Sequence, residues 1–438
     1  MAARSEPRPE AVAADRRESA GQSVLRGIGG RRAVVALTLV VLVRLVTWVG
    51  GFVMARGGLV AFDASSYLAS YHHLDLDPRL GDPSRVEFLR LWNYSDAEWY
   101  LSIAASSYPS RAEAIAAHNA PAGDHRSTER ENYMKYAFFP LYSLLVAALA
   151  VALPLRLAAF LVTTATSAAA AIAAMLLFTS FFPDEEQRSP LALALLLSFP
   201  FAVFYSLYFP EGLFLLLSLL VFLGLRSGSW ALVGVAGFCL SLTRPNGVFI
   251  VLPVAYALWR DSAKRHHGRQ GSAAPLAWTA LIPGGLVTYA AFNLARVGDP
   301  VFFHTVQYKW RNVTADPLGN LWRNVVERVS GFFSLDLHSF HSSKLDVVVM
   351  VAFACLIVAM WRDSRFPREL TIWAAVLWAV PLVSKDLMSF SRYMAVSFPV
   401  FYFLARSRQR WAPVAVLVAF FAGYLIALAG VIGYRWVG

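Results

Sequence analysis

Two carboxylates, Asp96 and Glu98, stand two positions apart in the segment WNYSDAEWYLSIAASSY at 92–108. A carboxylate can accept the proton of a hydroxyl group, so the pair could support proton transfer. The aromatic residues beside it, whose faces suit sugar rings, are Trp92, Trp99 and Tyr100. The alternative is that the acids are only solvated and that the rings anchor the chain at a membrane surface. The segment is therefore a candidate active site with an ordinary structural alternative.

A charged residue interrupts an apolar segment further along the chain. Arg244 lies in the sequence TRPNG, with Asn246 two positions later. A guanidinium in lipid is costly, so such a residue normally faces a polar cavity and has an anionic partner. A phosphate is a natural partner. The alternative is a structural pair with Glu211, which could equally end a helix or contact a substrate.

Two later motifs also combine polar and aromatic groups. Arg392 and Tyr393, in SFSRYMAVSFP, lie where a loop is expected to enter the membrane. An arginine there can bind a lipid phosphate, either for catalysis or only as a headgroup anchor. His304, Gln307 and Trp310, in GDPVFFHTVQYKW, have helical spacing. Polar groups beside aromatic rings suit a sugar, although an ordinarily packed loop helix would have the same pattern.

The elements that must position these residues are predicted to be membrane helices. The chain has 438 residues, of which 57% are hydrophobic and only 15% charged. Its long runs are apolar around the whole helical circumference, as expected for helices whose solvent is lipid. The net charge of +11 is spread over short loops and tails, which favours cytoplasmic loops and argues against a nucleic-acid partner. The predicted fold class is all-α and polytopic.

The start of the chain indicates its orientation. Residues 1–32 are polar and rich in arginine, which predicts a disordered cytoplasmic tail before a membrane domain at 33–438. The first span is expected at 33–54, so the long polar loop 55–136 would lie outside. Within that loop, residues 95–106 have the spacing of an amphipathic helix at the membrane surface.

The number of spans depends on one interrupted segment. Residues 230–259 contain TRPNG, where Pro245 removes a backbone donor and breaks the helix. Counting this segment as one span gives about eleven crossings of the usual length. The basic segments 260–271, 362–368 and 406–410 then lie in the cytoplasm, and a second large loop, 296–345, lies outside. The prediction is a multi-pass protein of the bacterial plasma membrane with an extracytoplasmic active site.

Six motifs in one order resemble the bacterial relatives of the GPI mannosyltransferase II (PIG-V) family, membrane glycosyltransferases of the GT-C class. In chain order they are WNYSDAEWYLSIAASSY, AFFPLYSLL, YSLYFPEGLFLLLSL, TRPNGV, GDPVFFHTVQYKW and SRYMAVSFPVF. The resemblance runs from about residue 85 to 405. It implies GT-C architecture, a polyprenyl-phosphate-linked sugar donor, most often mannose, and a catalytic base at Asp96 in the first external loop.

This chain departs from the family pattern in the first motif. The family acid usually follows tryptophan directly, whereas three residues separate Trp92 from Asp96, so Glu98 is the alternative occupant of that position. The family also usually has glycine where this chain has Ser107. A divalent cation, Mg²⁺ or Mn²⁺, could join the two acids, which neither require nor exclude it.

The resemblance implies a reaction at the outer membrane face. A sugar would pass from the donor to a hydroxyl of a glycan, glycolipid or protein acceptor, with inversion at the anomeric carbon. The residues expected to bind substrate are Trp92, Trp99, Tyr100, Glu211, Arg244, Asn246, His304, Gln307, Trp310, Arg392 and Tyr393. Two other classes remain open, namely a transporter or flippase for lipid-linked saccharides and a non-catalytic assembly factor.

Overall fold

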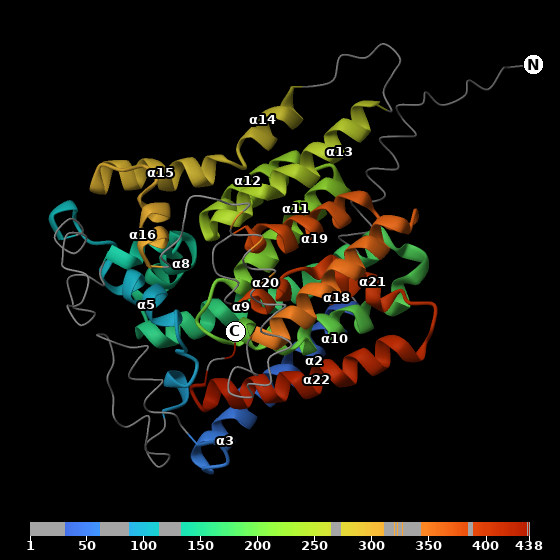
Figure 1. Cartoon of the computed structure of the whole chain (residues 1–438), viewed down its shortest axis with the longest axis horizontal. Coiled ribbons are helices and arrows are strands. Elements are labelled where there is room, and N and C mark those ends of the chain that lie inside the picture. The colour runs from blue at the N-terminus through green and yellow to red at the C-terminus, as the bar shows by residue number, and fades with distance from the viewer. Residues whose placement is uncertain are drawn as a thin grey trace, which may run out of the picture.

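The computed structural model describes residues 31–61, 87–113, 133–263, 273–310, 343–383 and 389–435, with the single positions 319, 322, 326 and 437. Every regular element within these residues is a helix. The predicted all-α class is therefore confirmed. In Figure 1, α5, α8, α15 and α16 lie together at the left of the bundle, and α22 runs along its lower edge.

The first half of the described chain forms a series of short and long helices. These are α2 (Arg31–Arg44), the π-helix η1 (Leu45–Gly50), α3 (Gly51–Arg56), η4 (Phe88–Arg90), α5 (Ala97–Ser106), η5 (Tyr133–Ala137), α8 (Pro140–Ala150), α9 (Leu155–Phe181), η6 (Pro183–Arg188), α10 (Ser189–Ser198), η7 (Pro200–Ser206) and α11 (Glu211–Ser227).

The second half of the described chain is also a series of helices. Its helices are α12 (Trp230–Thr243), η8 (Pro245–Ile250), α13 (Val251–Ala263), α14 (Ala274–Ala280), α15 (Gly284–Val297), α16 (Phe302–Trp310), α18 (Ser343–Arg362), α19 (Arg368–Leu382), α20 (Phe390–Ala395), α21 (Phe398–Ala405) and α22 (Trp411–Ile432).

Several helices are long and apolar enough to cross a bilayer. Within the described residues there are five, namely Ala33–Arg56, Leu155–Phe181, Ala274–Val297, Leu345–Arg362 and Trp411–Ile432. A sixth would form if α10 and η7, which meet at 83°, make one bent span. The first of these helices covers the predicted first span. The protein is thus an all-α membrane protein, and the count of about eleven crossings stays a prediction.

Two local predictions near the candidate site are confirmed. The expected helix at 95–106 corresponds to α5, which begins two residues later at Ala97. The expected break at TRPNG separates α12 from η8, and Arg244 has an extended backbone there, with φ −156° and ψ 149°. The turn also requires a glycine, since a Cβ on Gly247 would lie 2.3 Å from the carbonyl oxygen of Leu240. Residue 247 can therefore approach the end of α12 this closely only as glycine.

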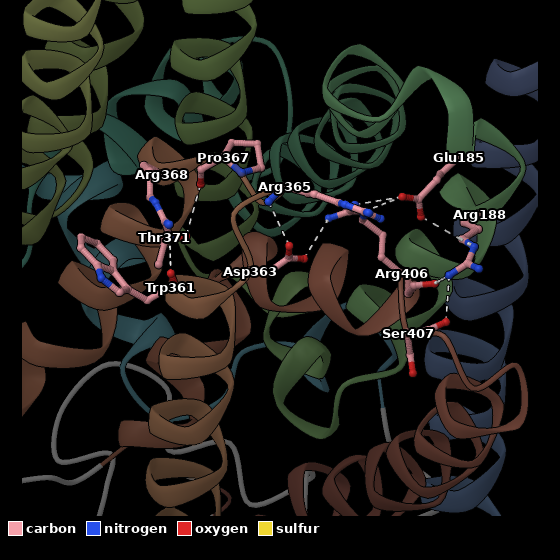
Figure 2. Close-up of polar contacts among 11 residues, drawn as sticks. Glu185, Arg188, Trp361, Asp363, Arg365, Pro367, Arg368, Thr371, Arg406 and Ser407 are labelled. Atoms are coloured by element: carbon pink, nitrogen blue, oxygen red, sulfur yellow. Dashed lines mark hydrogen bonds and ion pairs between the residues drawn. The ribbon is translucent and has the colours of Figure 1, made fainter.

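Arg406 joins three connecting segments at one end of the bundle (Figure 2). Its guanidinium lies 4.1 Å from the ring centroid of Phe182 and 2.9 Å from Glu185, in and before η6. Asp363, which follows α18, lies 4.0 Å away. Nearby, Arg188 donates hydrogen bonds to the carbonyls of residues 405 and 407, at the end of α21. Charge and ring contacts together therefore fix the chain where three helices end.

The basic segments predicted to share the cytoplasmic side make contacts with one another or with α19. Arg406 meets Asp363, and Arg260 donates to both carboxylate oxygens of Glu369 at 3.0 Å. The predicted segments 362–368 and 406–410 are thus neighbours, and the start of 260–271 lies beside α19. This placement agrees with their common side in the predicted topology.

Candidate active site

A cavity of about 370 Å³ lies where α5, η8, α16 and α20 converge. Its polar lining consists of Asp96, Tyr100, Thr243, Arg244, Asn246, Gln307, Ser389, Arg392 and Tyr393. The remaining wall is apolar and includes Phe138, Phe249, Leu286 and Val380. A cavity with convergent polar groups and a large apolar wall is the usual form of a small-molecule site.

Four charged side chains form a continuous chain at the polar end. The Oε1 atom of Glu211 accepts hydrogen bonds from Arg244 at 2.6 Å and from Arg392 at 2.5 Å. Arg392 also lies 3.4 Å from Asp96 Oδ2. Glu211 is fully buried, whereas the Asp96 side chain is 30% exposed. The carboxylate of Asp96 is thus the member of this network most open to the cavity.

Aromatic rings flank both guanidinium groups. The Cζ atom of Arg392 lies 4.3 Å from the ring centroid of Phe209 and 4.7 Å from that of Phe204. Arg244 lies 5.2 Å from the ring centroid of Tyr393. Stacking of this kind stabilises a desolvated guanidinium and fixes the plane of its donors. The rings therefore orient the two cations before any ligand arrives.

One edge of Arg244 remains available. Its Nη1 atom is buried and has no hydrogen-bond partner among the described residues, and the same holds for Oδ1 of Asn246. A buried donor without a partner is costly, by about 1–3 kcal/mol. Arg244 lines the cavity, so an anion placed there would supply the missing acceptor. The pair with Glu211, which the sequence analysis gave as the alternative to a phosphate, is present in the structure, and it leaves this edge unused.

The start of α5 determines how Asp96 is presented. Asp96 precedes the first helical residue, and its side chain makes no capping bond to its own helix. Residues four apart share a helix face, which accounts for Asp96 and Tyr100 both lining the cavity. Glu98 lies about 200° further round, given about 100° per residue. Its side chain instead accepts a hydrogen bond from Asn93, and burial raises its pKa.

The structure brings together most of the predicted site residues but not all of them. Those lining the cavity, or directly behind it in the case of Glu211, are Asp96, Tyr100, Glu211, Arg244, Asn246, Gln307, Arg392 and Tyr393. Glu98, Trp92, Trp99 and His304 are not part of the lining. The side chain of Trp310 lies outside the described residues.

Each residue outside the lining has a local reason for its place. Trp92 is fully buried and packs edge-on against Phe88, with centroids 5.7 Å apart. Trp99 stacks on Phe138, which itself lines the cavity, at a centroid distance of 5.8 Å. His304 lies on the exposed side of α16, whereas Gln307, three residues later, reaches the cavity. These predicted binding roles therefore have no support from the geometry.

A shared metal site for Asp96 and Glu98 does not fit this arrangement, because the two carboxylates face different directions and only Asp96 lines the cavity. Within the part of the chain that the structure describes, no three His, Cys, Asp or Glu side chains are grouped as metal ligands. Asp96 and Glu98 therefore do not form the two-acid chelate considered from the sequence.

Sequence reasoning missed Asp346, a buried acid in the first turn of α18. Its Oδ1 atom accepts hydrogen bonds from the backbone N–H of Ser391, at 2.9 Å, and from the Ser391 hydroxyl. Ser391 directly precedes Arg392, so this contact fixes the short helix α20 that carries the arginine. An acid at the start of an apolar run was the available signal.

No model of a known protein family matches this chain, and no curated protein matches it. The fold and the cavity alone therefore define its class. It is an all-α membrane protein in which carboxylate and guanidinium groups line a cavity with an apolar wall.

Proposed function

We propose that this protein is a membrane glycosyltransferase that moves a sugar, mannose in the first instance, from a polyprenyl phosphate to an acceptor hydroxyl. The observation that carries the proposal is that a carboxylate, Asp96, and the unpaired edge of a buried guanidinium, Arg244, line one cavity. A base and an anion site are what this reaction needs at the two ends of the reacting bond.

The step balances with these groups alone. Asp96 takes the proton of the acceptor hydroxyl while that oxygen forms a bond to the anomeric carbon. The bond from this carbon to the phosphate oxygen breaks, and the lipid phosphate leaves with the electron pair. Attack opposite the phosphate inverts the anomeric centre. In this proposal Arg244, together with Arg392, supplies the positive charge that stabilises the departing phosphate.

Among the described residues, the site offers a phosphodiester donor one free guanidinium edge within a neutral network. The network holds two guanidinium and two carboxylate groups, which together are neutral. A lipid-linked sugar phosphate carries one negative charge and gains a second as the phosphate departs. The free edge of Arg244 would form its strongest hydrogen bond at that stage, and interactions that strengthen in the transition state accelerate the reaction.

The apolar wall supports a lipid-borne donor. Phe249 lines the cavity and is 39% exposed. Leu286 and Val380 continue the apolar lining. In this proposal the isoprenoid chain of the donor packs against these apolar residues. GT-C architecture, about eleven spans and an extracytoplasmic site in the plasma membrane belong to the same proposal.

A transporter or flippase for lipid-linked saccharides is the second candidate. Broken helices in pairs are typical of transporters. The chain breaks at TRPNG and again between α10 and η7, where the axes meet at 83°. The second break, which the sequence analysis did not predict, favours this alternative. It would use the same charged network to bind its cargo.

Asp96→Asn tests the enzyme proposal. Purified protein in lipid vesicles receives polyprenyl-phosphate mannose and a mixed acceptor extract, and donor consumption is measured. Loss of a general base lowers turnover by about 100-fold or more. Glu98→Gln is the matched comparison, because it neutralises a neighbouring acid outside the cavity, and it is expected to retain turnover. Equal activity of wild type and Asp96→Asn would remove Asp96 from the role of base.

A further inference from the structure

The segment that follows α22 contacts the turn that carries Asp96. The backbone N–H of Ser95 donates to the hydroxyl of Tyr434 at 3.0 Å. The hydroxyl of Tyr94 donates to the carbonyl of Arg435 at 2.8 Å and accepts from the N–H of Val437 at 3.1 Å. These three hydrogen bonds join residues that are 339 to 343 positions apart.

Both partners of the central hydrogen bond have left-handed backbone conformations. Ser95 has φ +49° and Tyr434 has φ +57°. For a residue other than glycine this conformation costs about 1–3 kcal/mol and persists only where the surroundings enforce it. The rings of Tyr94 and Tyr434 provide such surroundings, because their centroids are 5.2 Å apart and both residues are buried. The ring contact and the hydrogen bond therefore stabilise the left-handed conformations of both residues together.

The direction of the Asp96 carboxylate depends on this turn. Its side chain does not cap α5, and its hydrogen bond to Arg392 is long, at 3.4 Å. Side-chain bonds thus hold the carboxylate weakly, and the backbone at Ser95 sets where it points. The ring of Phe204 connects this turn to Arg392. Its centroid lies 6.2 Å from the ring centroid of Tyr94 and 4.7 Å from the Cζ atom of Arg392.

We propose that Tyr434 is a positioning residue for Asp96, acting through the hydrogen bond that its hydroxyl accepts from the Ser95 backbone N–H. The inference rests on the proposed function, in which Asp96 is the base. Tyr434 touches no substrate in this account. It holds the strained turn so that the carboxylate reaches the acceptor hydroxyl. Small misplacements of a catalytic group can cost about 100-fold in rate.

Tyr434→Phe removes only the hydroxyl and keeps the ring that packs against Tyr94. The expected result is a fall in kcat of about 10-fold, while the KM for the donor changes less than about 2-fold because Arg244 and Arg392 are untouched. Tyr424→Phe is the matched control. Tyr424 is a buried tyrosine of α22 whose hydroxyl contacts Thr47, away from Asp96. It is expected to leave kcat unchanged.

Hydrogen exchange gives a readout that needs no activity. The Ser95 amide should exchange faster in Tyr434→Phe than in wild type, and Tyr424→Phe should leave it protected. If wild type transfers no sugar, the proposed function fails, and the exchange result still decides whether Tyr434 holds the turn.

Three results would overturn the inference. The first is unchanged kcat in Tyr434→Phe with an active wild type. The second is a fall in kcat without faster exchange at Ser95, since the effect would then not pass through the turn. The third is an equal fall in kcat in both tyrosine variants, which would indicate general loss of packing around α22.

Discussion

Glu211→Gln should destabilise the protein strongly, because it removes the counter-ion that two buried arginines share. Glu211 is fully buried and accepts from both guanidiniums through one oxygen, at 2.5 and 2.6 Å. Glutamine has nearly the same shape and keeps a carbonyl oxygen there, so the hydrogen bonds can persist while the charge is lost. Among the described residues, the carboxylate that Arg392 still has beside it is that of Asp96, 3.4 Å away.

The magnitude follows from the burial of the pair. Removing one partner of a buried ion pair costs about 3–5 kcal/mol, and glutamine should fall at the lower end, about 3 kcal/mol. Glu369→Gln is the matched control. It also neutralises a buried acid that binds an arginine, since the Glu369 side chain is only 7% exposed, but its single partner Arg260 is 37% exposed. The Arg260 guanidinium can therefore turn to solvent when the charge of Glu369 is lost, so the loss should cost about 1 kcal/mol.

Thermal unfolding in detergent compares the two variants. At about 1–2 °C per kcal/mol for a chain of this size, the midpoint should fall by roughly 3–6 °C in Glu211→Gln and by less than about 2 °C in Glu369→Gln. Equal midpoints for the two variants would refute the reasoning, since the buried acid would then not be holding two uncompensated charges together.

Two further predictions concern residues near the site. Asp346→Asn should lower kcat by about 10-fold with a smaller change in stability, because a neutral acceptor bonds Ser391 more weakly and frees the helix that carries Arg392. Unchanged kcat in Asp346→Asn would contradict this. Burial raises the pKa of Glu98 above its usual 4.5, so the folded state favours its protonated form. Stability from Glu98 is then fully present below about pH 4.5 and declines as pH rises through the folded pKa, and Glu98→Gln should flatten this slope of unfolding midpoint against pH.

The features predictable from the sequence were those with a local cause. Long apolar runs predict membrane helices because a helix surrounded by lipid must be apolar all round. The break at TRPNG follows from proline and glycine chemistry alone, and the structure has it at Arg244. The helix at 95–106 also follows from local spacing.

The features that sequence could not predict depend on packing between distant segments. The sequence left Arg244 with a phosphate or with Glu211 as alternatives, and it did not indicate that Arg392 also binds the same carboxylate oxygen. Glu98 was expected in the site beside Asp96 but does not line the cavity, because the exact start of α5 decides which acid faces it. Tyr434 lies 339 positions from its partner, Ser95, a separation at which no local pattern operates.

The fate of the donor in wild-type vesicles tests the central claim most directly. Polyprenyl-phosphate mannose with a labelled sugar is supplied to one leaflet, and its products are separated and identified by mass spectrometry. A glycosyltransferase should release one polyprenyl phosphate for each sugar that appears on an acceptor, with inverted anomeric configuration. Intact donor recovered in the opposite leaflet, with no free polyprenyl phosphate, would contradict it and identify a transporter.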